Sequence, residues 1–306
     1  MVLEQGTVVC QGHKDDDEDE CKPGMSLAET SPKHSQPILG MPIRLLQIQV
    51  AVDVLHDRYP YLVSLQRAFS DQTFCVGVLI RKDLVLTSAS CFSTGDLVPN
   101  LHIGTTNIRD AGEGEKRTAC RVMIHKNFQD DKIFLGYDIA LIQLDQDSTI
   151  EPVKLDRDAG TPPAEHPITM GWYLNENRFN PQHLQHVSMD TIPPSECSEK
   201  LDAFLPDLDT NLSDQMDMDK LVCVEFDGQQ CREGDGGAPL IKPGDGCGEN
   251  DVLLGMLSFG PQCQSPDIYT RITKMSLKNS DEQTLPLYLF SNVMHLLTIL
   301  QSKSLE

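Results

Sequence analysis

Six short runs rich in valine, isoleucine and leucine occupy the middle of the chain and set the strongest limit on its fold. Turn residues such as "RKD", "PGDG" and "GPQ" lie between them. Runs of this length with such boundaries are typical of β-strands. Many short strands joined by turns predict an all-β barrel or sandwich. The runs cover 61–66, 75–80, 84–89, 138–144, 252–259 and 267–272.

The segments on either side of these runs differ in composition and suggest the domain boundaries. Residues 1–47 are predicted to form a disordered acidic tail, because "DDDEDE" at 15–20 is followed by a stretch rich in proline and serine. A single domain is expected at 48–275. The extension 276–306 contains an apolar stretch after a proline, at 285–300, which predicts a helix packed on the barrel.

The ten cysteines bear on the compartment in which the chain works. No C-x-x-C pair occurs and the cysteines lie far apart, which favours disulfides over a zinc site; we expect no metal and no cofactor. Disulfides indicate an oxidising compartment, so the expected location is extracellular. The start, "MVLEQGTVVC", lacks the basic and apolar regions of a signal peptide, and no apolar run is long enough to span a membrane.

An acidic stretch at 198–222 is expected to be an exposed loop. Its "NLS" makes Asn211 a candidate glycosylation acceptor if the chain is secreted. The chain as a whole carries 25 lysines and arginines against 46 acids, a net charge of -21. This charge repels nucleic acids and anionic membranes and leaves neutral or basic proteins as the expected partners.

Three stretches in chain order carry a resemblance to a known family. They are "YPYLVSLQ…TFCVGVLIRKDLVLTSASC" (59–91), "YDIALIQL" (137–144) and "CREGDGGAPLI" (231–241). Together they resemble the chymotrypsin-like, or trypsin-family, serine proteases over about residues 48–275. The resemblance implies two six-stranded antiparallel β-barrels with the active site in the cleft between them.

The same resemblance implies pairings for six of the cysteines. The implied disulfides are Cys75–Cys91, Cys197–Cys223 and Cys231–Cys263. The remaining four cysteines have no implied partner, although the first two could close a small loop in the tail; they are Cys10, Cys21, Cys120 and Cys247.

The catalytic positions of the family can be compared with this chain residue by residue. The family needs a hydroxyl nucleophile, an imidazole base and a carboxylate that orients the imidazole. The carboxylate position is filled by Asp138, but Ser90 stands where the histidine belongs. The nucleophile position is Gly236, or Asp235 if counted from the preceding cysteine. Gly234, Asp235 and Gly236 are therefore expected to be a remnant of the nucleophile loop, and no functional catalytic residue is expected.

The specificity pocket of the family is also altered. Its floor corresponds to Gln229, where trypsin-like enzymes have an aspartate, and its wall glycines correspond to Gly260 and Asp267. A side chain would then intrude where a substrate enters. Neutral drift after loss of catalysis explains this, while Asp267 could still attract a basic group.

Three functional hypotheses follow. The first is a secreted, catalytically inactive protease homologue that binds another protein as an inhibitor, decoy or cofactor, similar to the oomycete glucanase-inhibitor proteins. The second is a residually active trypsin-like endopeptidase with a rearranged site, since Ser88 and Ser90 are expected near the cleft. The third is a drifting product without a selected function.

Overall fold

The computed structural model describes most of the central part of the chain. The described ranges are 52–54, 57–67, 73–93, 98–110, 112–157, 164–172, 183–204, 216–225, 236–244, 248–260 and 266–273. The acidic tail expected at 1–47, the helix expected at 285–300 and the rest of the extension 276–306 lie outside these ranges.

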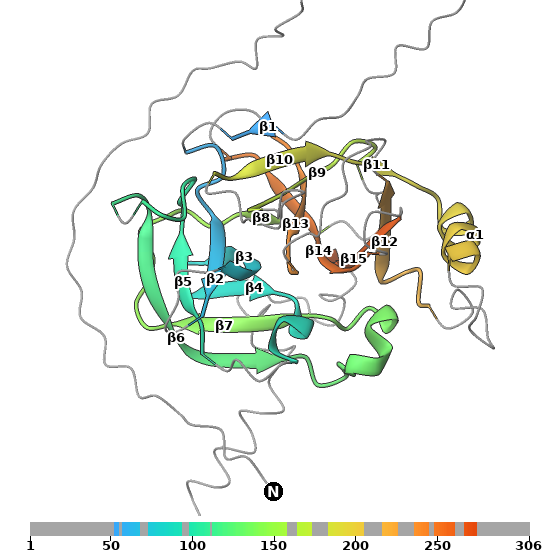
Figure 1. Ribbon diagram of the computed structural model, residues 1–306, viewed down its shortest axis with the longest axis horizontal. Coiled ribbons are helices and arrows are strands. Elements are labelled where there is room, and N and C mark those ends of the chain that lie inside the picture. The colour runs from blue at the N-terminus through green and yellow to red at the C-terminus, as the bar shows by residue number, and fades with distance from the viewer. Residues whose placement is uncertain are drawn as a thin grey trace, which may run out of the picture.

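The first half of the described chain forms a closed six-stranded barrel in the order β2-β3-β4-β7-β6-β5, with antiparallel neighbours (Figure 1). Two short 3-10 helices, η1 and η2, interrupt it. The bounds are β2 Leu62–Gln66, β3 Thr73–Arg81, β4 Leu84–Thr87, η1 Ala89–Phe92, β5 Asn100–Ile103, β6 Glu115–Ile124, η2 Asp130–Leu135 and β7 Ala140–Leu144.

The second half forms a nine-stranded sheet whose main path is β1-β10-β9-β13-β14-β15-β12-β11, with β8 pairing to β14. Six of its strands have four or more residues; β1, β8 and β11 have two each. Among the described residues this sheet is barrel-like and nearly closed, in agreement with the second barrel that the resemblance implied. The bounds are β1 Val52–Asp53, β8 Lys154–Leu155, β9 Ile168–Gly171, β10 Gln185–Ser188, β11 Asp190–Thr191, β12 Leu221–Glu225, β13 Pro239–Lys242, β14 Val252–Phe259 and β15 Asp267–Arg271.

All six strands expected from the apolar runs are present as β2, β3, β4, β7, β14 and β15, which confirms the all-β fold class. The acidic segment 198–222 was expected to be a loop, and that expectation was wrong at its start, because α1 (Pro194–Phe204) extends into it. Pro194 is the first residue of the helix, where its missing N–H costs nothing. Cys197 and Leu201, four residues apart, are both buried and give the helix an inward face.

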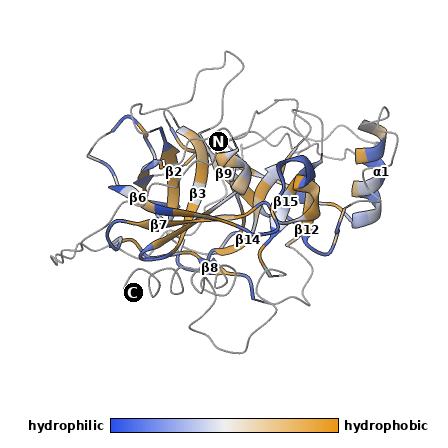
Figure 2. Cartoon of the chain, turned by 90° about the horizontal axis from the view of Figure 1, so that it is seen from below, coloured by the Kyte–Doolittle hydropathy of each residue, from blue (hydrophilic) through white to orange (hydrophobic). Residues whose placement is uncertain are grey.

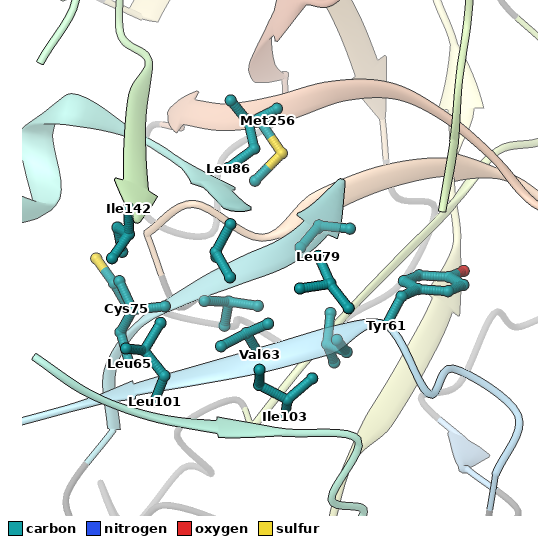
Figure 3. Packing of buried hydrophobic residues seen from close by; sticks show 14 of the residues in the cluster. Tyr61, Val63, Leu65, Cys75, Leu79, Leu86, Leu101, Ile103, Ile142 and Met256 are labelled. Atoms are coloured by element: carbon teal, nitrogen blue, oxygen red, sulfur yellow. The ribbon is translucent and has the colours of Figure 1, made fainter. Parts of the chain in front are cut away.

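A single apolar cluster joins the two sheets and fixes how they meet. Side chains of β2, β3, β4 and β5 fill the first barrel, and Met256 of β14 packs with them (Figure 3). Trp172, the only tryptophan in the chain, is fully buried and donates from Nε1 to the carbonyl oxygen of Thr106 (3.3 Å). Apolar residues concentrate on the strands and polar ones on the connections (Figure 2). Each fully buried aliphatic side chain contributes about 1.5–3 kcal/mol, so this cluster holds the junction firmly.

No helix among the described residues is both long and apolar enough to cross a membrane.

Candidate functional site

Asp138 lies at the junction of the two sheets, between η2 and β7, and is fully buried. Gly136, with φ 73°, ends η2 in the left-handed conformation that glycine adopts without strain, and the chain then turns inward to Asp138. The carboxylate accepts two hydrogen bonds from Ser90, one from the backbone amide to Oδ1 (2.8 Å) and one from Oγ to Oδ2 (2.9 Å). The strand β4 runs directly into η1 and so delivers Ser90 to this carboxylate.

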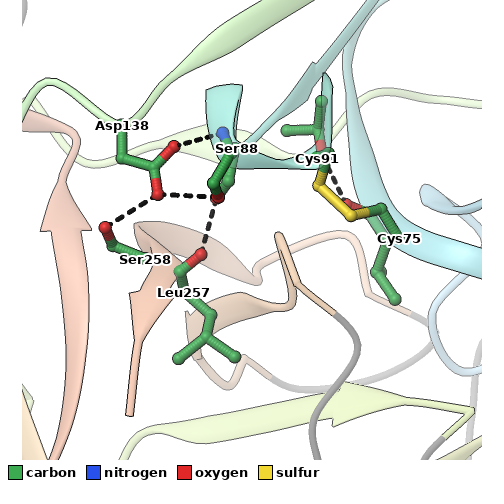
Figure 4. The surroundings of a disulfide bond; sticks show 9 residues. Cys75, Ser88, Cys91, Asp138, Leu257 and Ser258 are labelled. Carbon is green, nitrogen blue, oxygen red and sulfur yellow. Dashed lines mark hydrogen bonds between the residues drawn. A yellow bond between two sulfur atoms is a disulfide. The ribbon is translucent and has the colours of Figure 1, made fainter. Parts of the chain in front are cut away.

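The second sheet contributes a third polar contact, from a residue that sequence reasoning missed. Ser258, near the end of β14, donates from Oγ to Oδ2 of Asp138 (2.8 Å) (Figure 4). Beside it, Ser88 Oγ donates to the carbonyl oxygen of Leu257 (2.6 Å), which also links the first barrel to β14. The signal was the serine of "LSFG", two residues before the predicted wall position Gly260.

The electrostatics of this cluster are those of a desolvated carboxylate. Burial raises the pKa of the Asp138 carboxyl above its ordinary value, and hydrogen bonds from Ser90, Ser258 and the Ala89 amide oppose that rise. Ser88, Ser90 and Ser258 each donate a hydroxyl proton to an oxygen acceptor. A serine hydroxyl cannot accept a proton near neutral pH, so the cluster holds an acid and three hydroxyls but no imidazole base.

The ring of His125 stacks on that of Tyr137, the residue before Asp138 (centroids 5.1 Å apart). Burial lowers the pKa of His125 to about 4, with Lys126 and Lys220 adding to the effect. Its Nδ1 accepts a hydrogen bond from the amide of Asn127 (3.2 Å). His125 is therefore a neutral ring packed against Tyr137 at neutral pH.

Gly236 lies against the disulfide Cys75–Cys91, which is present in the structure. A Cβ at this position would come within 3.2 Å of Cys75 Sγ. The Gly236 carbonyl accepts a hydrogen bond from the Val76 amide (2.8 Å) and so ties the loop to β3. The next residue, Gly237, has φ 77°, and a side chain there would collide with the Val76 carbonyl. The backbone at this turn therefore requires glycine at Gly237, while nothing with a reacting atom stands at Gly236.

Asp267 and Gly260, the two predicted wall positions, lie side by side. Asp267 opens β15, and its Oδ1 occupies the place that a Cβ on Gly260 would take. Burial alone raises the pKa of Asp267 to about 6. The carboxylate thus lies against Gly260, the other residue that the resemblance assigns to the pocket wall.

Several predicted residues lie outside the described ranges: Gln229, Gly234, Asp235, Asn211 and the pair Cys231–Cys263. The disulfide Cys197–Cys223 is present and joins α1 to β12. Cys120 of β6 is disulfide-bonded as well. Within the described part of the chain, no group of three or more histidine, cysteine, aspartate or glutamate residues could hold a metal ion.

The comparison with known proteins identifies the family. Residues 49–278 match the trypsin family, which is most of the chain. The chain belongs to the trypsin family. Within it, glucanase inhibitor protein 3 of Phytophthora infestans is 28% identical over 225 residues, covering 70% of this chain and 80% of that protein. Glucanase inhibitor protein 2 of the same organism is 29% identical over 225 residues, covering the same shares.

Two proteases are also similar. Serine protease Hayan of Drosophila melanogaster is 28% identical over 229 residues, covering 70% of this chain but 36% of Hayan, so the chain spans about a third of that protein. The secreted serine protease VesC from Vibrio cholerae superposes with a TM-score of 0.61 at 20% identity, covering 74% of this chain and 46% of VesC. This last likeness shows the fold.

Proposed function

We propose that this member of the trypsin family is secreted, catalyses no acyl transfer and acts by binding another protein. The observation that carries the proposal is the hydrogen bonding of Asp138, whose carboxylate is occupied by Ser90 and Ser258 where the family's acid would orient an imidazole. Gly236 supports it, since it has no nucleophilic atom. Loss of nucleophile and base typically lowers turnover by about a million-fold in enzymes of this type.

The proposed partner is a secreted hydrolase or protease, to which this protein binds as an inhibitor, a decoy or a cofactor. The similarity to proteins named glucanase inhibitors supports a hydrolase and makes a glucanase the first candidate. The disulfides Cys75–Cys91 and Cys197–Cys223 support an oxidising, extracellular location. The net charge of -21 favours a partner with a neutral or basic contact surface and disfavours nucleic acid and anionic membranes.

The catalytic half of the proposal is tested with a fluorophosphonate probe, which reacts with an activated serine. The purified, oxidised protein is expected to remain unlabelled while active trypsin labels under the same conditions, and a peptide-hydrolysis assay should show no turnover. Labelling that prior heat denaturation abolishes would refute inactivity.

The binding half is tested by immobilising the oxidised protein and passing purified secreted endoglucanases and trypsin-like proteases over it. Saturable retention of one of them supports the proposal. The reduced, unfolded protein serves as the matched control. A cooperatively folded protein that retains none of these hydrolases would contradict the proposal and favour the drifting product.

One contact favours a second candidate, a residually active endopeptidase. Ser90 Oγ donates to Asp138, and because burial raises the pKa of this carboxyl, the carboxylate is a better proton acceptor for a serine than an exposed aspartate would be. If the probe labels the protein, the variant Ser90→Ala decides: labelling lost in Ser90→Ala but retained in Ser258→Ala assigns the activity to this pair.

A further inference from the structure

Cys120 of β6 is disulfide-bonded, and the other cysteines of the chain narrow the choice of its partner. Five of the ten cysteines lie in the described ranges, and the four besides Cys120 are bonded to one another as Cys75–Cys91 and Cys197–Cys223. The partner of Cys120 is therefore one of the five cysteines outside those ranges. They are Cys10, Cys21, Cys231, Cys247 and Cys263.

Three of these five are accounted for elsewhere. The family resemblance pairs Cys231 with Cys263. Cys247 is bonded to Gly248, and consecutive α-carbons lie about 3.8 Å apart. A Cβ on Gly248 would lie 3.1 Å from the carbonyl oxygen of Arg58, in the segment that leads into β2. Cys247 therefore stays close to the start of β2.

Cys120 lies far from the start of β2. The strands β2 and β6 run in the same direction on either side of β5, and Val63 and Glu115 both pair with Ile103. Cys120 is five residues further along β6 than Glu115, which is about 16 Å of strand, whereas the start of β2 lies in the opposite direction. A disulfide needs α-carbons within about 7 Å of each other. This distance excludes Cys247 and leaves the two cysteines of the tail.

The local structure of β6 suits a bond to a segment outside the barrel. Ala119 pairs with Leu144 and Arg121 with Gln143, the adjacent residue of β7, so Cys120 is the extra residue of a β-bulge. A bulge interrupts the regular alternation of side chains along a strand. Cys120 is partly exposed, although Ala119 beside it is buried. A segment that approaches from solvent can therefore reach this position.

The charge of β6 also favours the tail. The strand carries three basic residues, Lys116, Arg117 and Arg121, against one acid, Glu115, in a chain with 46 acids and 25 basic residues. The Arg117 guanidinium pairs with the Glu115 carboxylate (2.8 Å), while Lys116 is exposed. The strand is thus a basic element on an acidic protein and attracts an acidic segment.

We propose that Cys120 is bonded to a cysteine of the tail, Cys10 or Cys21, and that this bond holds the acidic run at 15–20 against the basic residues of β6. The run ends directly before Cys21 and begins five residues after Cys10. Five residues of extended chain span about 18 Å, so either bond keeps the run close to the strand. The occupant of this surface is a segment of the same chain, and the inference does not depend on the proposed function.

The bond is tested on the full, oxidised protein by cleavage after lysine and arginine without reduction, followed by mass spectrometry. This cleavage separates Cys120, Cys21 and Cys10 into the peptides 118–121, 15–33 and 1–14. The first peptide is expected to be joined to one of the other two. Its attachment to any other cysteine of the chain overturns the inference.

A cut in the tail provides a second test. A specific protease site is inserted at 34–36, and after cleavage the tail should stay attached on a gel without reductant and separate with reductant. Cys120→Ser should release the cleaved tail without reductant, and Cys247→Ser, the matched control, should keep it attached. The fluorescence of buried Trp172 reports that each variant is folded. Release of the tail from the oxidised, unmodified sequence overturns the inference.

The placement of the acidic run on β6 is tested by the rate at which lysines are acetylated. Lys116 should react at least twofold faster in Cys120→Ser than in the unmodified protein, because the run no longer covers it. Lys154 of β8, which is exposed in the second sheet, should react equally in both. Equal rates at Lys116 would overturn this placement. None of these measurements involves a hydrolase, so their failure is distinct from failure of the proposed function.

Discussion

The role of Asp138 can be tested by removing its carboxylate. In the structure this side chain accepts hydrogen bonds from two backbone amides, of Ala89 and Ser90, and from the hydroxyls of Ser90 and Ser258. The hydroxyls can rotate toward other acceptors, but the two amides cannot. If the role of Asp138 is to hold the two sheets together, Asp138→Ala should destabilise the fold whether or not the protein has catalytic activity.

The magnitude follows from those two amides. Each buried donor left unsatisfied costs about 1–3 kcal/mol, so Asp138→Ala exposes the fold to a loss of about 2–6 kcal/mol. Removing a desolvated charge offsets part of this, because burial already raises the pKa of Asp138. We expect a net loss of about 2–4 kcal/mol in the free energy of unfolding. Asp138→Asn keeps one side-chain oxygen that can accept a hydrogen bond from a backbone amide, so it should change the free energy of unfolding by less than about 1 kcal/mol.

Urea unfolding of the oxidised protein, followed by fluorescence of Trp172, measures both variants. Trp172 suits the purpose because it is fully buried and bonded across the junction to Thr106. A loss below about 1 kcal/mol for Asp138→Ala, or equal losses for the alanine and asparagine variants, would show that the amides do not depend on this carboxylate.

Three further predictions use the same assay. Gly237→Ala should cost about 2 kcal/mol or more, because φ is 77° and the new methyl group meets the Val76 carbonyl, whereas Gly112→Ala at an exposed turn should cost little; equal effects would contradict the backbone argument. Asp267→Asn should stabilise the protein by about 3 kcal/mol at pH 8, because burial raises the pKa of Asp267 from 3.8 to about 6 and the ionised side chain therefore destabilises the folded state. This gain in stability should shrink between pH 6 and pH 4 and disappear below pH 4, whereas a gain that does not depend on pH would refute the prediction. Asp251→Ala should cost about 3–5 kcal/mol, because it leaves Arg58 without its carboxylate in a largely buried site, and a loss below about 1 kcal/mol would contradict that reading.

Much of the fold could be predicted from sequence because the strands of the junction are apolar on both faces. The run at 75–80 lies in β3, whose central residues are fully buried, and the run at 252–259 coincides with β14. The charged strand β6 had no such signal, since only Ala119 of its ten residues is buried and the others are exposed or partly buried. Helix α1 was missed because the acids on its outer side mask the spacing of Cys197 and Leu201.

The candidate site was predictable in its parts and not in its contacts. Ordered motifs located Ser90, Asp138 and Gly236, but only the folded chain shows that a hydroxyl from each sheet donates to the same carboxylate. Likewise the sequence placed Asp267 on a wall, while its closeness to Gly260 depends on a register shift between β14 and β15 that no local pattern encodes. Strand pairing between distant parts of the chain, and the burial that follows from it, determines the contacts of Asp138 and those of Asp267.

Restoring a histidine at position 90 and a serine at position 236 would show whether these two side chains are all that the chain lacks for acyl transfer. Asp138 and Ser258 remain in place, so a histidine at position 90 could donate to the carboxylate that Ser90 now contacts. A serine at position 236 needs the Cys75 sulfur to give way by a few tenths of an ångström, since its Cβ would lie 3.2 Å away. We expect the double variant Ser90→His, Gly236→Ser to react with the fluorophosphonate probe and each single variant to remain unlabelled, because a nucleophile needs its base. Equal labelling of Gly236→Ser alone would show that another base is present. No labelling of a folded double variant would mean that the backbone around Gly236 has also lost the arrangement that acyl transfer requires.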